Sequence, residues 1–524
     1  MGNRSLSLLL ALPVLVGCLD GGLERAAPRG REGTGPGVSL VDVAQSARPT
    51  APAVPGLTGP RAAAGLEAVR PFDPPTLALD DGWQHRGGDV DQLGGAQQWQ
   101  RTVGATGWDS VQQVARYDAD EVVVVGWIEG SVDFGGLCGV IKPGRRTKTE
   151  DFVYASYVAR FTDAGVCQWI DAFDGDDAWP AAVVVDAAKD IYVAGMFSSE
   201  VRFGDGFDVV TAGMAEDVFL ARYTDKGLDW TRSITGTSDT WAYDVAVVED
   251  GDGADLVLVG SFDGTAELDG ATSLTASGGY DMLVARWSST GALVFATAVG
   301  AEGTEDAGSV AVVGTDIVVA GTFDSATLPV GGVASFNNAG IYDSALIGFG
   351  ASGTPRWARQ LGGDGPDWIA DVAAVGGDVA MVGCFSGAVA FAGLPELTSD
   401  GTSMLVARVS GGGNGQWAHV VSSAGGLACA TAVRVGPSGD LYVAAVIDGA
   451  AAFGATLVSP AAGAWSIVSA RYAGGGGDTP RWASKRDRSG GFTPPLLDLS
   501  DRYVVLSADV TDNGGDGALY GLGL

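Results

Sequence analysis

Histidine and positive charge are both scarce in this chain. There are 2 His among 524 residues, and 31 Lys and Arg stand against 63 Asp and Glu, for a formal net charge of −32. His85 and His419 lie far apart in the sequence and outside any catalytic motif, so catalysis by histidine is not expected. Because so acidic a protein repels polyanions, we expect no nucleic-acid partner.

Long hydrophobic runs are missing after the first residues. No later segment holds 18 consecutive apolar residues, so no further membrane-spanning helix is expected. The chain begins MGNRSLSLLLALPVLVGC, with a positive Arg4, a short apolar run and a cysteine at position 18. This segment resembles a bacterial lipobox, in which Cys18 receives a lipid and becomes the mature N-terminus.

The lipobox resemblance implies a signal peptide at 1–17 and a lipid bilayer as partner through Cys18. Leu19 follows the cysteine, where an Asp would favour the inner membrane, so we expect a cell-envelope lipoprotein of the outer membrane or cell surface. An ordinary signal peptide with an incidental cysteine is the alternative. Residues 18–78 are rich in Pro, Gly, Ala and Arg without periodicity, which predicts a flexible tether before a folded part at 79–524.

An internal repeat organises the folded part. Comparing the chain with itself aligns an aromatic residue every 60 to 70 residues. These residues are Trp99, Trp169, Trp230, Phe295, Trp357, Trp417 and Trp482. Each interval holds an apolar stretch, a polar turn, a strand ending in Gly-aromatic, a variable insertion, and a third strand before the next aromatic strand. The pattern predicts four strands per repeat, and helical periodicity of useful length is absent.

Seven central hairpins can be counted along the chain. The last repeat lacks its Trp-bearing strand at the C-terminus, and the strand around Trp99 supplies one at the front. We therefore predict an all-β fold, a seven-bladed β-propeller with four-stranded blades whose last blade is closed by an N-terminal strand. The repeated Trp is expected to pack between neighbouring blades.

The hairpin DAAKDIYVAGMF and its sister segments resemble the SBBP-type β-propeller repeats of bacterial surface lipoproteins. The resemblance covers about residues 95–524 and implies a propeller at the cell envelope, but no activity. The segment ARYTDKGLDW is also similar to the tryptophan-docking repeat of quinoprotein dehydrogenases and of the propeller lipoprotein of outer-membrane barrel assembly.

Four cysteines remain after Cys18, an even number for an oxidising compartment. Cys138 and Cys167 fall in the first repeat, and Cys384 and Cys429 fall in the adjacent fifth and sixth repeats. We expect two disulfides with this pairing, and free buried thiols are the alternative.

Aspartates recur just before the first strand of the repeats. They are Asp109, Asp177, Asp239, Asp306 and Asp367. These connections and the insertions would open on one face near the central channel, which predicts an acidic binding face. The alternative is that the carboxylates cap turns through backbone amides.

A second set of aspartates precedes the third strand, and an arginine recurs on that strand. The residues are Asp217, Asp281 and Asp343, with Arg160, Arg222, Arg286, Arg408 and Arg471. We expect structural charge pairs between strands or blades.

One turn offers carboxylates at alternate positions. Asp250, Asp252 and Asp255 stand on a Gly-bent loop that resembles the calcium loops of integrin-type propellers, although Val248 occupies the place of the leading Asp. Calcium is therefore a candidate ligand, with a solvated Asp-Gly turn as the alternative. No other cofactor is expected.

The composition and motifs favour a non-enzymatic surface module that binds an envelope protein or glycan. A first alternative is a propeller enzyme, either a quinoprotein-like oxidoreductase or a hydrolase or lyase of envelope polysaccharide, because carboxylates alone can perform glycoside chemistry. A second alternative is a scaffold in envelope assembly.

Overall fold

The structure is a computed structural model, and it is all-β in its described part. The residues that it describes are 83–86, 97–103, 109–142, 154–175, 178–198, 200–203, 209–210, 215–249, 253–423, 426–454, 456–462, 464–476, 480–488, 495–499, 503–509 and 517–523. In these residues no helix could cross a membrane. Their strands pair antiparallel, and most of them fall into seven groups of four, which we call units 1 to 7.

Within each unit the chain passes from an inner strand to an outer strand. Unit 1 contains β3 (Asp109–Arg116), β4 (Glu121–Glu129), β7 (Tyr154–Thr162) and β8 (Cys167–Gly175). Unit 2 contains β9 (Trp179–Val185), β10 (Ile191–Phe197), β13 (Asp217–Thr224) and β14 (Gly227–Gly236). Unit 3 contains β15 (Thr240–Glu249), β16 (Ala254–Phe262), β19 (Asp281–Trp287) and β20 (Leu293–Val299). Unit 4 contains β21 (Glu305–Val313), β22 (Asp316–Phe323), β25 (Asp343–Phe349) and β26 (Pro355–Gly363).

The last three units follow the same order. Unit 5 contains β27 (Asp367–Val375), β28 (Asp378–Ala390), β29 (Leu397–Ser410) and β30 (Gly415–Val421). Unit 6 contains β31 (Ala428–Val435), β32 (Leu441–Ile447), β35 (Trp465–Tyr472) and β36 (Trp482–Arg488). Unit 7 contains β37 (Leu496–Leu499), β38 (Tyr503–Asp509) and β39 (Gly517–Gly523), and β2 (Gln97–Val103) is its outer strand.

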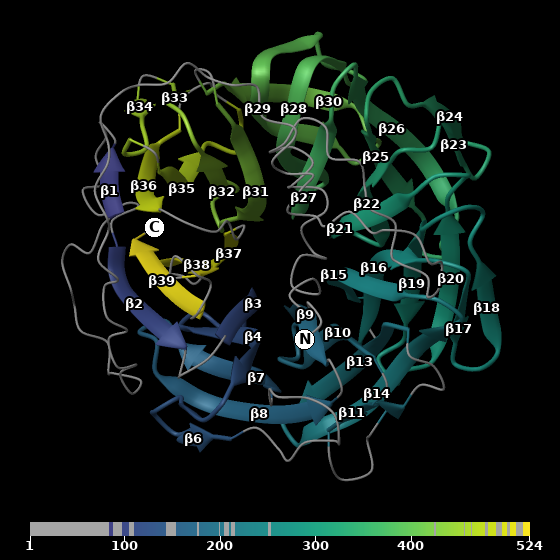
Figure 1. Ribbon diagram of the computed structural model, residues 1–524, viewed down its shortest axis with the longest axis vertical. Coiled ribbons are helices and arrows are strands. Elements are labelled where there is room, and N and C mark those ends of the chain that lie inside the picture. The colour runs from purple at the N-terminus through teal and green to yellow at the C-terminus, as the bar shows by residue number, and fades with distance from the viewer. Residues whose placement is uncertain are drawn as a thin grey trace, which may run out of the picture.

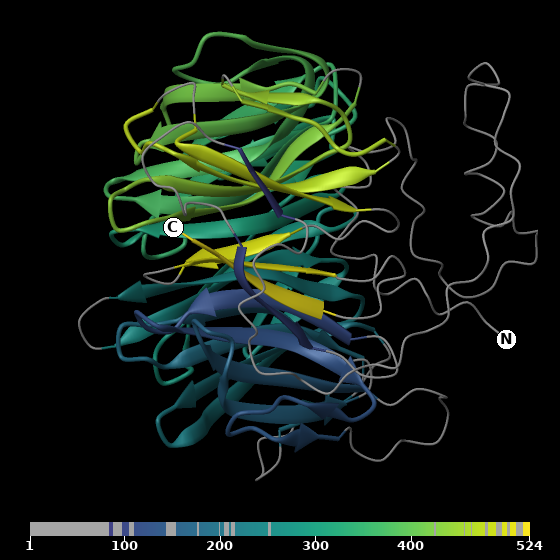
Figure 2. The same cartoon turned by 90° about the vertical axis from the view of Figure 1, so that its left-hand side faces the viewer.

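The units stand in a ring with their inner strands towards the centre (Figure 1), and the ring is a thick disc when seen from the side (Figure 2). The ring closes at unit 7, where β2 pairs with β39 from the far end of the chain. The pairing predicted for the strand around Trp99 is therefore present. One further strand, β1 (Trp83–Arg86), pairs with the outer strand of unit 6 and has no counterpart in the repeat pattern.

The insertions between the second and third strands form small hairpins. These are β5 (Val132–Asp133) with β6 (Val140–Ile141), β11 (Glu200–Arg202) with β12 (Val209–Val210), β17 (Thr265–Leu268) with β18 (Thr272–Thr275), β23 (Thr327–Val330) with β24 (Ala334–Asn337), and β33 (Ala451–Phe453) with β34 (Thr456–Val458). Strands β11 and β17 pair with β8 and β14, the outer strands of the preceding units. These two hairpins thereby tie neighbouring units together at the outer edges of their sheets.

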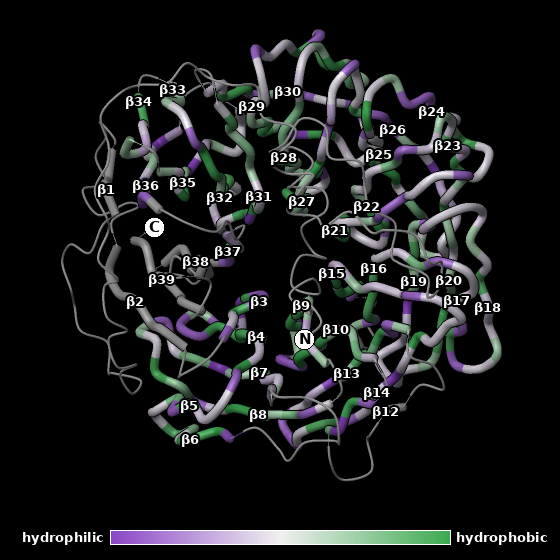
Figure 3. The backbone as a smooth tube through the Cα atoms, viewed as in Figure 1, coloured by the Kyte–Doolittle hydropathy of each residue, from purple (hydrophilic) through white to green (hydrophobic). Residues whose placement is uncertain are grey.

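The hydrophobic core lies between successive units. Strand β16 is buried at every position because both of its faces are covered by neighbouring units. One core cluster joins residues of units 2 and 3, such as Leu220 and Leu256, and the next joins units 3 and 4, such as Val257 and Val319. Figure 3 shows hydrophobic residues along the strands and hydrophilic residues in many of the turns.

Four of the repeated aromatic residues, Trp230, Phe295, Trp357 and Trp417, contact the next unit, as predicted. The Trp230 indole donates a hydrogen bond of 3.1 Å to the Ser289 carbonyl, in the turn before the outer strand of unit 3. In the corresponding turns of units 4, 5 and 6, a glycine lies directly against the aromatic ring of the preceding unit. These contacts join Phe295 to Gly353, Trp357 to Gly413, and Trp417 to Gly476.

Both predicted disulfides are present. Cys138, beside the first hairpin, is bonded to Cys167 on the outer strand of unit 1. Cys384 on β28 is bonded to Cys429 on β31, so this bond joins units 5 and 6. The pairing expected from the repeat order is confirmed.

Candidate functional site

The aspartates predicted to form a binding face occupy three different positions. Asp109 and Asp367 are the first residues of their strands and stand opposite Ile128 and Phe385 of the second strands. In unit 4 that position belongs to Glu305, and Asp306 is one residue further on. In unit 3 it belongs to Thr240, and Asp239 comes one residue earlier. Asp177 lies outside the described residues.

Three of these carboxylates accept hydrogen bonds from backbone amides. Glu129 N donates to Asp109 over 2.9 Å, Glu216 N donates to Asp239 over 3.0 Å, and Ser386 N donates to Asp367 over 3.3 Å. Asp109, Asp306 and Asp367 are buried. These side chains therefore hold the ends of neighbouring strands together, as the capping alternative expects.

The arginines on the third strands pair with acids at the start of the second strands. The pairs and their N–O distances are Arg160–Glu121 at 3.2 Å, Arg222–Asp190 at 2.6 Å, Arg286–Asp255 at 2.8 Å, Arg408–Asp378 at 2.8 Å and Arg471–Asp440 at 2.8 Å. These are structural charge pairs, but Asp217, Asp281 and Asp343 are not the partners, because they lie at the opposite end of the third strand.

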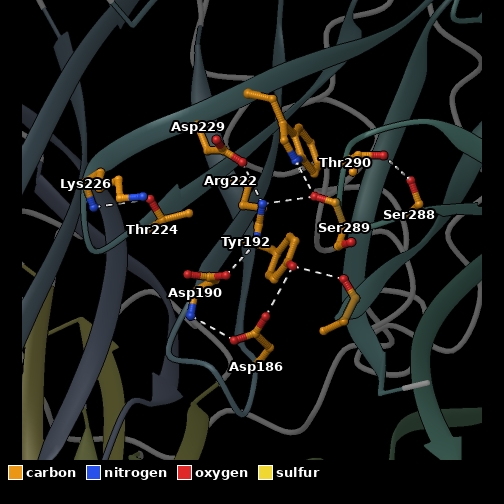
Figure 4. A network of polar contacts seen from close by, with 12 residues as sticks. Asp186, Asp190, Tyr192, Arg222, Thr224, Lys226, Asp229, Ser288, Ser289 and Thr290 are labelled. Atoms are coloured by element: carbon orange, nitrogen blue, oxygen red, sulfur yellow. Dashed lines mark hydrogen bonds and ion pairs between the residues drawn. The ribbon is translucent and has the colours of Figure 1, made fainter. Parts of the chain in front are cut away.

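Figure 4 shows how this arrangement joins units 2 and 3. Arg222 contacts Asp190 and Asp229, each over 2.6 Å, and donates to the Ser289 carbonyl of unit 3 over 3.0 Å. The Tyr192 hydroxyl lies beside Asp186 and donates to the Ala254 carbonyl of unit 3 over 3.0 Å. The network satisfies polar groups at the seam between units and has a structural role.

The proposed calcium turn is described only at its last carboxylate. Asp255 accepts hydrogen bonds from Arg286 Nε over 2.8 Å and from Ser289 N over 3.2 Å, so its oxygens are engaged within unit 3. Asp250 and Asp252 lie outside the described residues, as does Cys18. Among the described residues, no three His, Cys, Asp or Glu side chains gather as a metal site would require.

A polar network crosses the inner strands around the centre of the ring. Six inner strands contain a β-bulge at the same place. Four residues that directly follow such a bulge accept a hydrogen bond from a backbone amide of the following inner strand. These bonds are Val183 N to Gln113, Val310 N to Asp244 at 3.0 Å, Val372 N to Ser309 at 3.2 Å, and Val433 N to Asp371 at 2.7 Å.

Ser309 joins two carboxyl groups in this network. Its hydroxyl oxygen lies 3.1 Å from Asp244 Oδ2 and 2.8 Å from Asp371 Oδ1. A hydroxyl has one hydrogen to donate, so both contacts are hydrogen bonds only when one carboxyl is protonated and donates to the serine. Asp371 also faces Arg434, whose Nη1 is 2.7 Å from its Oδ2, and Asp498 lies 3.9 Å from Arg434 on the other side.

The two carboxyl groups lie in different electrostatic environments. Burial raises the pKa of Asp244 to about 6, and the negative charge of Asp371 adds to the shift. Burial opposes the charge of Arg434, but Asp371 and Asp498 outweigh it and raise the pKa of the guanidinium, so Arg434 stays cationic. The pKa of Asp244 is thus raised, whereas Asp371 is the member paired with a cation.

We call Asp244, Ser309, Asp371 and Arg434 the central acid network. It is not sealed from solvent, since the side chain of Arg434 keeps 27% of its surface exposed. This site could not be predicted from the sequence, because its residues are about 60 apart and carry no shared motif. The available signal was a polar residue in the middle of otherwise apolar first strands, as in WAYDVAVV and WIADVAAV.

Among known proteins, only solved structures are similar to this chain, and the similarity is one of fold. No protein-family model matches it, and no curated protein is similar to it. Sqt1 from Chaetomium thermophilum aligns at a TM-score of 0.37 and 14% identity, covering 80% of this chain and 97% of Sqt1. A polysaccharide lyase of family PL25, an ulvan lyase bound to -[GlcA(1-4)Rha3S]-, aligns at 0.38 and 10% identity, covering 84% and 96%.

The expectation of a non-enzymatic protein is corrected by these comparisons, because two structures of this lyase, one of them bound to a saccharide, are among those that the chain resembles. TM-scores this low describe a distant likeness of fold. The activity and substrate of the lyase are therefore not assigned to this chain.

Proposed function

We propose that this protein is a lipid-anchored enzyme of the cell envelope, a seven-bladed β-propeller whose central acid network performs acid–base chemistry on an envelope polysaccharide. The propeller is supported by seven four-stranded units in a ring and by the pairing of β2 with β39. The anchor is supported by the sequence that ends at Cys18, and an oxidising location by the two disulfides.

The observation that carries the activity is the pair Asp244 and Asp371 on either side of Ser309. Glycoside hydrolysis needs one protonated and one ionised carboxyl group, and the environments of these two groups separate them in that way. Because both bridging oxygens contact the same hydroxyl, they are at most about 6 Å apart, close to the spacing of about 5–5.5 Å in retaining glycosidases.

In this proposal Asp244 gives its proton to the glycosidic oxygen that leaves, and Asp371, held by Arg434, stabilises or attacks the sugar carbon. Water then supplies the hydroxyl group of the new reducing end and returns a proton to Asp244, so the products are two shorter saccharides. Activity should fall as the pH rises above about 6, because the proton donor is then ionised.

The test is turnover of envelope polysaccharides by the purified chain, measured as new reducing ends. Asp244→Asn should lower turnover about 100-fold or more, the usual contribution of a general acid. Asp316→Asn is the matched control, because Asp316 pairs with an exposed arginine at the protein surface. Full activity of Asp244→Asn, or products that carry an unsaturated sugar at the non-reducing end, would exclude the hydrolytic proposal.

A further inference from the structure

At each of two seams of the ring, two buried acidic residues lie close enough that the charge of one acts on the other. At each of three successive seams, the first residue of an inner strand donates its amide to the residue before a third strand. The bonds are Thr240 N to Glu216 O at 2.7 Å, Glu305 N to Tyr280 O at 2.7 Å, and Asp367 N to Tyr342 O at 3.1 Å. The residues brought together are Asp217 with Thr240, Asp281 with Glu305, and Asp343 with Asp367.

The four acids of the second and third seams are buried, with at most 1% of each residue exposed. Each has one carboxyl oxygen that forms no hydrogen bond with the described residues: Asp281 Oδ1, Glu305 Oε1, Asp343 Oδ1 and Asp367 Oδ2. A buried charge without a partner is costly, so these oxygens require a proton or an ion that the side chains around them do not supply.

The groups around these acids donate hydrogen bonds and carry no positive charge. Ser277 N and Ala301 N donate to Asp281 and Glu305 over 3.0 and 2.7 Å. Around the other pair, the donors are Ala339 N to Asp343 at 3.3 Å, Gln360 Nε2 to Asp343 at 2.5 Å, and Ser386 N to Asp367 at 3.3 Å.

No lysine or arginine of the described residues forms an ion pair with these four acids. The other ionisable group that acts on Asp367 is Asp364, which is also acidic. Calcium prefers six to eight oxygen ligands, whereas each seam offers two free carboxyl oxygens among N–H donors. The surroundings therefore favour a proton over a metal ion.

We propose that each of these two seams is a proton-binding site, in which Asp281 with Glu305 and Asp343 with Asp367 share a proton that fastens neighbouring units. A hydrogen bond between a protonated and an ionised carboxyl uses both free oxygens and removes one buried charge. The proposal does not depend on the activity proposed for the central acid network.

The electrostatics agree with this geometry. Burial raises the pKa of all four acids, and the charge of Asp343 helps to bring the pKa of Asp367 to about 8. The folded protein then binds more protons than the unfolded chain from about pH 4 to pH 8. The sites therefore stabilise the fold fully below about pH 4, and this contribution is lost as the pH rises through 8.

The test compares thermal unfolding of the wild type, Asp367→Asn and Asp367→Thr from pH 5 to pH 9, in EDTA. Asn keeps the shape of a neutral acid, and Thr copies the seam in which Thr240 faces Asp217. The Tm of the wild type should fall as the pH rises, both variants should lose part of that slope, and Asp367→Asn should exceed the wild type at pH 9. Asp316→Asn, which removes an exposed carboxylate, should keep the wild-type slope.

Infrared spectra give a second measurement that does not depend on unfolding. The wild type should show a protonated-carboxyl band at pH 7 that weakens in Asp367→Asn. A wild-type Tm that is independent of pH, or the absence of that band, would refute the shared proton. Calcium that raises the Tm of the wild type but not of Asp367→Asn at pH 8 would refute it in favour of a cation site.

Discussion

Gly413 provides a quantitative test of how the aromatic residues join the units. It lies in the turn between β29 and β30, with a φ of +82°, and a Cβ added there would lie 2.4 Å from Cε3 of Trp357 in the preceding unit. We predict that Gly413→Ala is destabilising for two reasons. The left-handed backbone costs about 1–2 kcal/mol for a residue with a Cβ, and overpacking against the indole adds about 1–3 kcal/mol.

The chain offers a matched control at Gly376, in the turn between β27 and β28. Its φ is +63°, but a Cβ there would meet nothing within 4 Å. Gly376→Ala should therefore carry only the backbone cost of about 1–2 kcal/mol. The difference between the two variants isolates the contact with Trp357.

The assay is urea unfolding followed by far-ultraviolet circular dichroism, because a tryptophan substitution would disturb fluorescence. In a Trp357→Leu background, Gly413→Ala should cost no more than Gly376→Ala, since the indole is gone. Equal costs of Gly413→Ala and Gly376→Ala in the wild-type background would refute the packing argument.

Further predictions concern covalent and ionic links. Replacing Cys384 and Cys429 by Ser should lower the free energy of unfolding by about 2–5 kcal/mol, measured by urea unfolding without reductant, and an unchanged midpoint would contradict this. Arg286→Leu should cost about 3–5 kcal/mol because it leaves Asp255 buried without its cation. Arg356→Leu should cost less than about 1 kcal/mol in the same assay, since 57% of that arginine side chain is exposed. Equal losses in the two arginine variants would contradict the role of burial.

The sequence was sufficient for features that depend on order along the chain. The strand around Trp99 could be matched to the end of the chain because one repeat lacked a strand, and an unpaired sheet edge is unfavourable. The disulfides followed from the same order, since Cys384 and Cys429 fall in adjacent repeats. The Trp contacts were predictable because a large apolar side chain repeated once per unit needs a partner surface in the next unit.

Features that depend on the register of a strand were not predictable. Asp239, Asp306 and Asp367 look equivalent in the sequence, but they stand at three different positions relative to the second strand. One residue of shift moves a side chain to the other face of a strand, and nothing in the residue types marks the shift. The bulges that precede Asp244 and Asp371 shift the register in the same way, and the residue types do not mark them either.

The arginine partners were missed for a related reason. Asp217 and Arg222 are five residues apart on one strand, so they cannot be opposite each other, and the partner of Arg222 is Asp190 on the adjacent strand. Cross-strand neighbours are set by pairing, which a recurring pattern along one strand does not contain. The strand β1 lies in a segment without any repeat pattern, and its pairing with β36 had no signal in the sequence.

The buried acids also change the meaning of the formal charge. The formal net charge of −32 counts every carboxyl group as ionised. Taken alone, it would indicate that all the acidic side chains lie on the solvated surface. Asp244 and the pairs at the two seams are set among inner and third strands, and protons bound there make the protein less negative near neutral pH. Because the pKa of Asp244 is raised to about 6 and that of Asp367 to about 8, the net charge should become more negative between about pH 6 and pH 8, where surface acids are already ionised. The acidity of this chain is therefore partly a property of its core.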